Sequence, residues 1–336
     1  MDYTHLSAVA QSAWIDLNRL VGDAALSDMR GKPVKKTIGA KHYWYDRYRV
    51  GAQVVDRYLG EDNAPLRDRI ARADSLRTHQ EGARRERARL VRLLRAEGMM
   101  MPDLANGQIV AALARAGVFR LGGTVVGTQA FRLYEGVLGV RMGLDQAVAT
   151  DDIDIASFER LSLALGDRAD PDLPRVFSEL KFEPQPSPRE NAVWRWQQST
   201  RGTLVEFLTP SFEEDEGLRS LPALGVSAQA LHFLNYLIAA PMQVPFAYRD
   251  GVQVQVPQPA RFAIHKLIVA DRRRGGVAQF KARKDRAQAA FVIGVLADED
   301  PDTLHDALAE ARDKGSAWRD AITASLARMP DTARRL

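Results

Sequence analysis

The sequence contains no cysteine, which excludes both disulfide bonds and metal sites built from thiolates. It also lacks a long apolar run. The best candidate, 231–242, is interrupted by His232, Asn235 and Pro241 and is shorter than the roughly 20 residues that a membrane-spanning helix needs. The first residues, Met-Asp-Tyr-Thr-His, show no basic segment ahead of an apolar one, as a secretory signal would. We therefore expect a cytoplasmic protein without a membrane span.

The composition is that of a chain that buries ordinary hydrophobic cores. Of its 336 residues, 46% are hydrophobic and 27% are charged, which excludes a disordered chain. The length predicts at least two domains. A shift in composition at Gly98-Met-Met-Met-Pro102 marks the first boundary. We predict a basic N-terminal module over 1–100, a catalytic core over 101–225 and a mainly helical domain over 226–336.

Positive charge is concentrated in the N-terminal third. Residues 31–60 contain seven Lys or Arg against two Asp, and residues 64–98 contain ten Arg against five acids. The whole chain carries a net charge of only +4, so the remainder is negative. An anionic partner is therefore expected to contact this third first.

The N-terminal module is predicted to contain a helix over 5–26, two or three antiparallel strands within 37–60, and a helical stretch from Pro65 that Gly82 divides. Five aromatic residues lie within 43–58, close to basic residues. Aromatic faces beside cations suit nucleic acids, through base stacking and phosphate contact. The candidate contacts are Lys35, Lys41, Tyr43 and Tyr45. Alternatively, the aromatic side chains form the core of a small sheet.

The remainder reads as a mixed α/β core followed by helices. We expect strands over 118–124, 152–156, 193–196, 203–208 and 252–256. Helices are predicted over 107–116, 129–138, 174–180, 228–239, 258–274, 281–297 and 302–328. The predicted fold class is therefore α/β (α+β) with a mixed sheet, a helical C-terminal half and an N-terminal module of helix and β-hairpin.

Two acidic side chains share one face of a predicted strand. Alternate residues of a strand point the same way, so Asp152 and Asp154 face one side while Ile153 and Ile155 enter a core. Two apposed carboxylates repel each other unless a cation lies between them. Glu206, an isolated acid in the apolar strand 203–208, is the best third ligand. Three carboxylates predict a Mg²⁺ or Mn²⁺ site.

A glycine-rich turn precedes these acids. Gly122, Gly123 and Thr124 are predicted to offer backbone N–H groups to phosphate oxygens. The segment does not fit Gly-x-Gly-x-x-Gly, and the chain has no Gly-Lys-Ser/Thr motif, so neither a dinucleotide fold nor a P-loop is expected.

These residues together resemble the nucleotidyltransferase fold of the polymerase-β superfamily. The match rests on Gly122-Gly123-Thr124, Ala130-Phe131, 138–141 and 150–155. The sequence is also similar to abortive-infection nucleotidyltransferases of toxin–antitoxin systems. The resemblance implies an NTP substrate, a divalent metal, and nucleotide contacts from Lys266, Lys284 and Asp285. Asp152, Asp154, Glu206 and Lys266 would be catalytic. It also implies an RNA acceptor, particularly a tRNA end, a toxin or defence role, and an antitoxin-like partner.

Several alternatives stay open at this point. Gly123 and Asp152 are 29 positions apart, whereas the superfamily has about a dozen residues between turn and acids, so an extra segment must be accommodated. Glu206 could instead pair with an arginine such as Arg195, and Asp285 with Arg286. Lys266 and Lys284 could be ordinary solvated charges. The alternative function is a non-catalytic nucleic-acid-binding or regulatory protein that keeps the fold.

Overall fold

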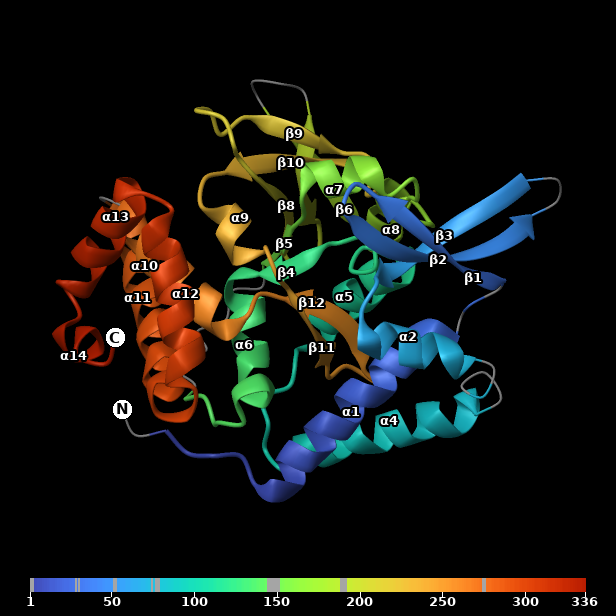
Figure 1. Cartoon of the computed structure of the whole chain (residues 1–336), viewed down its shortest axis with the longest axis horizontal. Helices are drawn as coiled ribbons and strands as arrows, with labels where there is room; N and C mark the ends of the chain where they lie inside the picture. Colours follow the sequence, from blue (N-terminus) through green and yellow to red (C-terminus); the bar gives the residue numbers. More distant parts are fainter. Residues whose placement is uncertain are drawn as a thin grey trace.

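The computed structural model describes residues 3–27, 29, 31–50, 53–73, 75, 79–143, 152–187, 192–273 and 276–336. A seven-stranded sheet lies between a small three-stranded sheet at one end of the molecule and a bundle of C-terminal helices at the other (Figure 1). The predicted fold class is confirmed: a mixed α/β core, a helical C-terminal region, and an N-terminal helix with a three-stranded antiparallel sheet.

The N-terminal module combines helices with a separate antiparallel sheet. Its elements are α1 (Ala8–Ser27), β1 (Lys32–Ile38), β2 (Lys41–Val50), β3 (Gln53–Glu61), α2 (Ala64–Ala71) and α4 (Gln80–Ala96). The strands pair in the order β1-β2-β3. Asn63 caps α2 by accepting the N–H of Leu66, and Pro65 occupies the first turn. The prediction that Gly82 divides the helical stretch is wrong, because Gly82 lies inside α4.

The central sheet mixes parallel and antiparallel strands. The elements from 104 to 256 are α5 (Leu104–Ala116), β4 (Thr124–Val126), α6 (Gly127–Leu138), β5 (Ile153–Ala156), α7 (Glu159–Ala164), α8 (Leu173–Glu179), β6 (Phe182–Pro186), β7 (Val193–Gln198), β8 (Leu204–Pro210), β9 (Leu218–Leu221), β10 (Val226–Leu231), α9 (Leu234–Leu237), β11 (Met242–Phe246) and β12 (Val252–Val256). The main path runs β4-β5-β8-β10-β9, and β7 joins β6 to β8. Strand β8 is parallel to β5 and β10 and antiparallel to β7. Strands β11 and β12 form a separate hairpin.

Two predictions of secondary structure are wrong in this region. The expected strand over 118–124 is a turn, and β4 starts only at Thr124, after the glycine pair. The expected helix over 228–239 begins as β10, whose side chains alternate between buried and half-buried. Ala and Leu have high helix propensity, and here pairing with β8 and β9 overrides that preference.

Helices make up the C-terminal region, as predicted. They are α10 (Pro259–Arg272), α11 (Gly276–Glu299), α12 (Pro301–Asp313), α13 (Ser316–Leu326) and α14 (Pro330–Ala333). The single helix expected over 302–328 is divided at Gly315, which has a φ of 131° and precedes α13. No helix in the described part of the chain is both long enough and apolar enough to cross a membrane.

One hydrophobic core extends through all three predicted domains. Leu6 from the N-terminal segment, Phe131 from α6 and Leu326 from α13 belong to the same buried cluster. The indole of Trp14 in α1 packs so closely on Gly136 of α6 that a side chain at 136 would overlap it. The division at 100 and 225 therefore stays a prediction, and the core itself crosses both boundaries.

Candidate active site

A row of side chains crosses the central sheet on one face. Val126 of β4 pairs with Asp154 of β5, Asp154 with Glu206 of β8, and Glu206 with Arg195 of β7. Directly paired residues of neighbouring strands share a face. The sheet therefore places two of the predicted acids side by side and adds a cation next to the second.

Asp154 lies in an environment that disfavours its charged form. It is half-buried between buried Ile153 and Ile155. Burial raises the pKa of its carboxyl to about 7, and the nearby Glu206 carboxylate contributes to this rise, whereas the ammonium of Lys266 acts in the opposite direction. A cation that binds such a carboxyl stabilises its ionised form.

Asp152 lies one alternation earlier and is also half-buried. Its Oδ1 accepts the backbone N–H of Leu204 at 3.3 Å, which ties the start of β5 to the start of β8. It also contributes to the electrostatic environment of Asp154. Thr150 and Asp151, which precede it in the predicted motif, lie outside the described residues.

Glu206 forms an ion pair with Arg195, with 2.5 Å between Oε1 and Nε. The guanidinium also lies over the ring of Trp194, 4.5 Å from its centroid. This is the pairing that the sequence left open as an alternative. Glu206 thus lies beside Asp154 and is already paired with the guanidinium of Arg195. Its role as a metal ligand stays a prediction.

Helices α10 and α11 bring basic residues to the same acids. Nζ of Lys266 donates to Oδ1 of Asp285 at 2.7 Å, and Arg273 pairs with Oδ2 of that carboxylate. Asp285 is almost fully buried, at 2% exposure. Burial lowers the pKa of Lys284, as does the charge of Lys266, while Asp285 and Asp154 act in the opposite direction. The structure therefore brings Lys266 and Lys284 near Asp154, and Asp285 pairs with Lys266 and Arg273 rather than with Arg286.

Sequence reasoning missed Arg273. The signal was available: Arg273 is seven positions after Lys266, which puts both on one face of a helix. Its charge lowers the pKa of Asp154, as that of Lys266 does. His265, which neighbours Lys266, is buried, and desolvation lowers its pKa to about 3. It is therefore a neutral packed side chain.

The glycine turn differs from its predicted role. The N–H groups of Gly122 and Gly123 donate to the carbonyls of Phe119 and Val118, so these donors are not available to phosphate. Thr124 is buried in β4. Instead, Gly127 begins α6 next to Asp154, with a φ of 65° and no room for a side chain beside the Asp154 carboxylate.

The junction between β4 and α6 at 126–128 is therefore the segment that adjoins Asp154, the position that the sequence analysis assigned to the turn at Gly122. The first N–H groups of α6 have no acceptor within the helix and lie at its positive end. A sequence signal existed, because Gly127-Thr128 follows the β-branched pair Val125-Val126.

The residues present fit a divalent metal held by two carboxylates. Among the described residues, no group of three His, Asp or Glu converges as a ready ligand set. Asp152 and Asp154 offer oxygen ligands, which Mg²⁺ prefers, and this ion usually keeps several waters and binds one or two carboxylates together with substrate phosphates. Burial raises the pKa of Asp154 and the Glu206 carboxylate adds to the rise, so a bound cation would relieve the cost of ionising this carboxyl.

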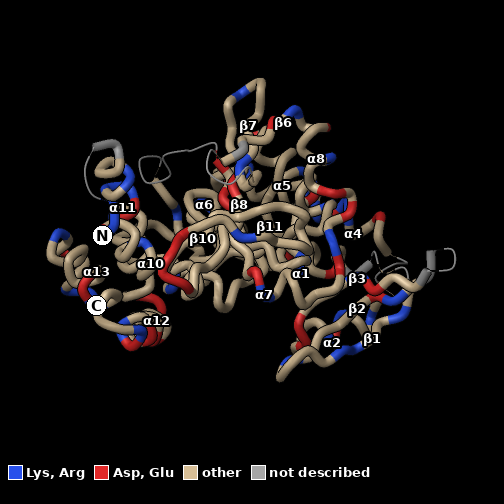
Figure 2. Tube along the Cα trace, turned by 90° about the horizontal axis from the view of Figure 1, so that it is seen from above, with Lys and Arg blue, Asp and Glu red and all other residues tan. Residues whose placement is uncertain are grey.

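The predicted nucleic-acid contacts of the N-terminal sheet are mostly engaged within the protein. Tyr43 and Tyr45 are buried and pack against Tyr58, so their faces are not open to a base. This contradicts the stacking interpretation and agrees with the structural alternative. Lys35 and Lys41 are exposed but form ion pairs with acids of the same module. Lysine and arginine nevertheless gather along β1, β2 and β3 (Figure 2).

Comparison with known proteins identifies one region by family. A family model described as Nucleotidyltransferase matches residues 105–313, which include every element of the site described above. A second model, described as a domain of unknown function, matches residues 15–68. Searches of curated proteins and of solved structures found no match.

Proposed function

The chain belongs to the nucleotidyltransferase family and is therefore a transferase, and we propose that it moves a nucleoside monophosphate group from an NTP to an acceptor hydroxyl with release of pyrophosphate. The observation that carries this proposal is the pair of strand acids facing a basic helix pair. Burial and the Glu206 carboxylate disfavour the ionised form of Asp154, and the ammonium of Lys266 favours it. Phosphoryl transfer needs mainly positioning and neutralisation of charge, which such a site supplies.

Asp152 and Asp154 are the residues that would hold Mg²⁺ or Mn²⁺. Such an ion would neutralise charge on the triphosphate and on the leaving pyrophosphate. Lys266 and Arg273 would contact phosphate oxygens, with Lys284 adding positive charge. Asp285 is a positioning residue, because it holds Lys266 and Arg273 on one carboxylate. The N-terminal end of α6 at Gly127 and Thr128 would bind phosphate through backbone N–H groups.

Glu206 is proposed to accept the proton of the acceptor hydroxyl or to complete the metal site. Both roles require the ion pair with Arg195 to open, because that guanidinium occupies one of its carboxylate oxygens. Arg195 is partly exposed, with 39% of its side chain accessible, so it has room to swing away and contact an incoming phosphate.

The basic N-terminal third favours RNA as the acceptor, and the choice of a tRNA end also depends on the resemblance to toxin-type nucleotidyltransferases. A toxin or defence role and an antitoxin-like partner rest on the resemblance to abortive-infection enzymes alone.

Transfer of label from α-³²P-NTP tests the activity. The wild-type protein should label an RNA pool in Mg²⁺ and not in EDTA. Asp152→Asn and Asp154→Asn should each reduce transfer by orders of magnitude. Lys266→Ala should cost on the order of 2–4 kcal/mol in the transition state, equivalent to about 30- to 1,000-fold in rate. The matched control is Lys281→Ala, an exposed lysine of α11, which should retain full transfer.

The competing function is a non-catalytic nucleic-acid-binding protein. It predicts RNA binding with no metal-dependent labelling by any of the four NTPs, and equal behaviour of the wild type and Asp154→Asn. Labelling that survives in EDTA or in Asp154→Asn would refute the proposed site.

A further inference from the structure

A groove of about 2370 Å³ separates the N-terminal sheet from the central core. Its walls come from β2 and β3 on one side and from α5, the turns around α7 and the β11–β12 hairpin on the other. Its described lining includes neither the strand acids nor Lys266, so it is distinct from the site proposed above. Sites for small ligands have volumes of roughly 300–1,000 Å³. A groove of this size has room for a polymeric ligand.

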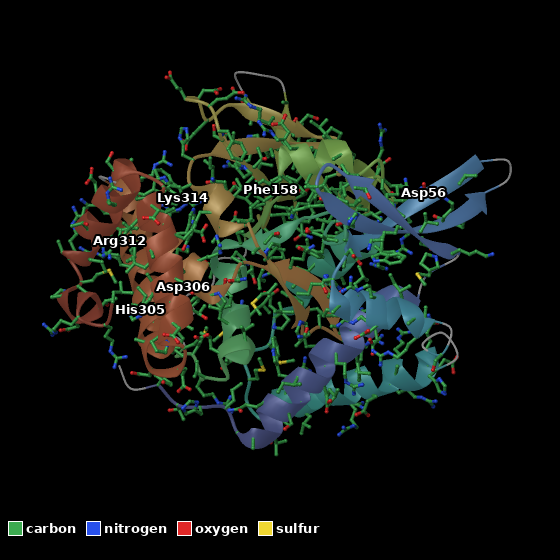
Figure 3. The ribbon with its side chains drawn as sticks, viewed as in Figure 1. Asp56, Phe158, His305, Asp306, Arg312 and Lys314 are labelled. Atoms are coloured by element: carbon green, nitrogen blue, oxygen red, sulfur yellow. The ribbon has the colours of Figure 1, made fainter. Side chains whose placement is uncertain are left out.

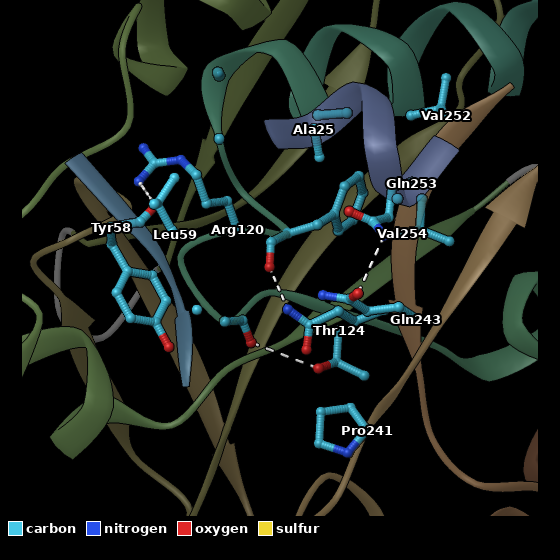
Figure 4. Close-up of a pocket in the computed structure, with 18 of the residues that line it drawn as sticks. Ala25, Tyr58, Leu59, Arg120, Thr124, Pro241, Gln243, Val252, Gln253 and Val254 are labelled. Atoms are coloured by element: carbon cyan, nitrogen blue, oxygen red, sulfur yellow. Dashed lines mark hydrogen bonds between the residues drawn. The ribbon is translucent and has the colours of Figure 1, made fainter. Parts of the chain in front are cut away.

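The two walls are fixed to each other. Arg120, from the turn after α5, donates to the carbonyl of Tyr58 in β3 at 2.6 Å and pairs with Asp167. Asp167 in turn accepts the N–H of Tyr58 at 2.7 Å. Figure 4 shows Arg120 reaching Tyr58 on one side of the groove, with Thr124, Gln243 and Pro241 at another side. The groove is therefore part of the folded structure, held open by buried polar contacts.

The groove carries a surplus of arginine. Nine lysine or arginine side chains line it, against six carboxylates. Five of those carboxylates are already engaged: Asp167 binds Arg120, Asp250 binds Arg84 and Arg87, Asp172 caps α8, Asp62 pairs with Lys35 and Glu61 with Lys41.

Four exposed arginines remain without a carboxylate partner among the described residues: Arg115, Arg160, Arg168 and Arg249. Arg160 lies over the ring of Phe212 and Arg249 over that of Tyr248. Arginine binds phosphate through its planar fork of donors.

We propose that this groove binds single-stranded nucleic acid through its phosphates. Repeated phosphate charges match several guanidinium groups that have no carboxylate partner, and eight of the nine cations among the described lining residues are arginine. Single strands bind in basic grooves that follow the backbone and that aromatic side chains border. The assignment of the bound strand as the acceptor rests on the proposed function, but the binding itself does not.

Binding of a fluorescein-labelled 12-nucleotide oligo(U), measured by anisotropy in EDTA without NTP, tests the proposal. The double variant Arg115→Ala/Arg168→Ala should bind at least tenfold more weakly at 0.1 M NaCl. Each lost phosphate contact lowers the slope of log K against log[salt] by about 0.7 for a single strand, so this slope should fall by about 1.4. The Arg115→Lys/Arg168→Lys variant should recover most of the slope, because it retains both charges.

The matched control removes the same charge elsewhere. Arg175 and Arg312 are exposed and lie outside the groove, and Arg312 is labelled on α12 in Figure 3. Their double alanine variant should bind oligo(U) like the wild type. Equal loss of binding in this control, or wild-type affinity in the groove variant, would overturn the proposal. So would displacement of oligo(U) by polyglutamate at the same charge concentration, since that result indicates an acidic protein ligand.

The outcome separates this proposal from the proposed function. Asp152→Asn should bind oligo(U) like the wild type while losing transfer. If the wild type transfers label but does not bind oligo(U) at 50 mM salt, the groove proposal fails and the catalytic one stands. If the groove variant alone loses binding and neither the wild type nor any variant transfers label, the groove proposal stands and the catalytic proposal fails.

Discussion

Replacing Asp154 with asparagine should stabilise the metal-free protein, and the gain should grow with pH. Asp154 shares its sheet face with Glu206, and burial raises its pKa to about 7 from an ordinary value of 3.8. Because the folded pKa is the higher one, the folded state binds the proton more tightly than the unfolded state. The free energy of unfolding of the wild type therefore falls as pH rises from about 4 to 7. An asparagine side chain has no proton to lose in this range, so the variant lacks this decline.

The magnitude follows from the shift. A raise of about 3 pH units corresponds to about 4 kcal/mol at pH 8, where Asp154 is ionised in both states. Near pH 5 the cost is only about 2 kcal/mol, and below pH 4 it vanishes. We expect the stability difference between the variant and the wild type to follow this curve and to level off above pH 7.

Urea unfolding in EDTA at pH 4, 5, 6, 7 and 8 measures the difference. The control is Asp306→Asn, an exposed carboxylate labelled on α12 in Figure 3, which should show no comparable trend. Millimolar Mg²⁺ should raise the stability of the wild type at pH 8 and should do less for Asp154→Asn, because a ligand that binds only the folded state stabilises it. If the variant is no more stable than the wild type at pH 8, the conclusion that the ionised form of Asp154 is disfavoured in the metal-free protein is refuted.

Three further predictions concern the surroundings of the site and the N-terminal sheet. Asp285→Asn should cost about 3–5 kcal/mol in urea unfolding, because it leaves the largely buried Lys266 and the partly exposed Arg273 without their counter-ion; a loss below 1 kcal/mol would contradict the positioning role. Gly127→Ala should lower stability by more than about 1 kcal/mol and abolish label transfer, whereas Gly82→Ala, inside α4 with open space around it, should raise the melting temperature. Tyr45→Phe removes a hydrogen bond to a backbone carbonyl and should cost about 1 kcal/mol without changing RNA affinity; unchanged stability with weaker RNA binding would restore the stacking interpretation.

Local patterns were enough to place the candidate acids on strands. Strict alternation around Ile153 and Ile155 placed Asp152 and Asp154 on one face, and the structure buries both isoleucines while leaving Asp154 half-buried between them. The isolated acid Glu206 was likewise assigned to the right strand, directly opposite Asp154. These are properties of a few consecutive residues, for which strand periodicity is decisive.

Long-range pairing could not be read from the sequence. Whether Glu206 faces a metal or Arg195 depends on the register between β7 and β8, and periodicity carries no information about register. The glycine pair was misassigned for a related reason. A run of small residues indicates a turn, but only the pairing of Val126 with Asp154 shows that Gly127, rather than Gly122, adjoins the acids.

The aromatic residues of the N-terminal sheet raise a similar difficulty. Tyr43 and Tyr45 stand beside lysines in the sequence, which favours nucleic-acid contact, and their spacing equally suits an internal face. Only the packing of the sheet against the rest of the chain decided between the two, by burying both rings.

The packing of α1 has a consequence for how the chain can be synthesised. Leu17 and Val21 lie against Gly251, next to β12, although 234 positions (251 minus 17) separate Leu17 from that glycine. At a typical 5–20 residues per second, the ribosome synthesises Gly251 roughly 10–50 s after Leu17. Throughout that interval the first helix exposes part of its apolar face. The N-terminal third therefore completes its folding only after most of the polypeptide has been made, and a nascent chain arrested before residue 251 should bind chaperones through α1.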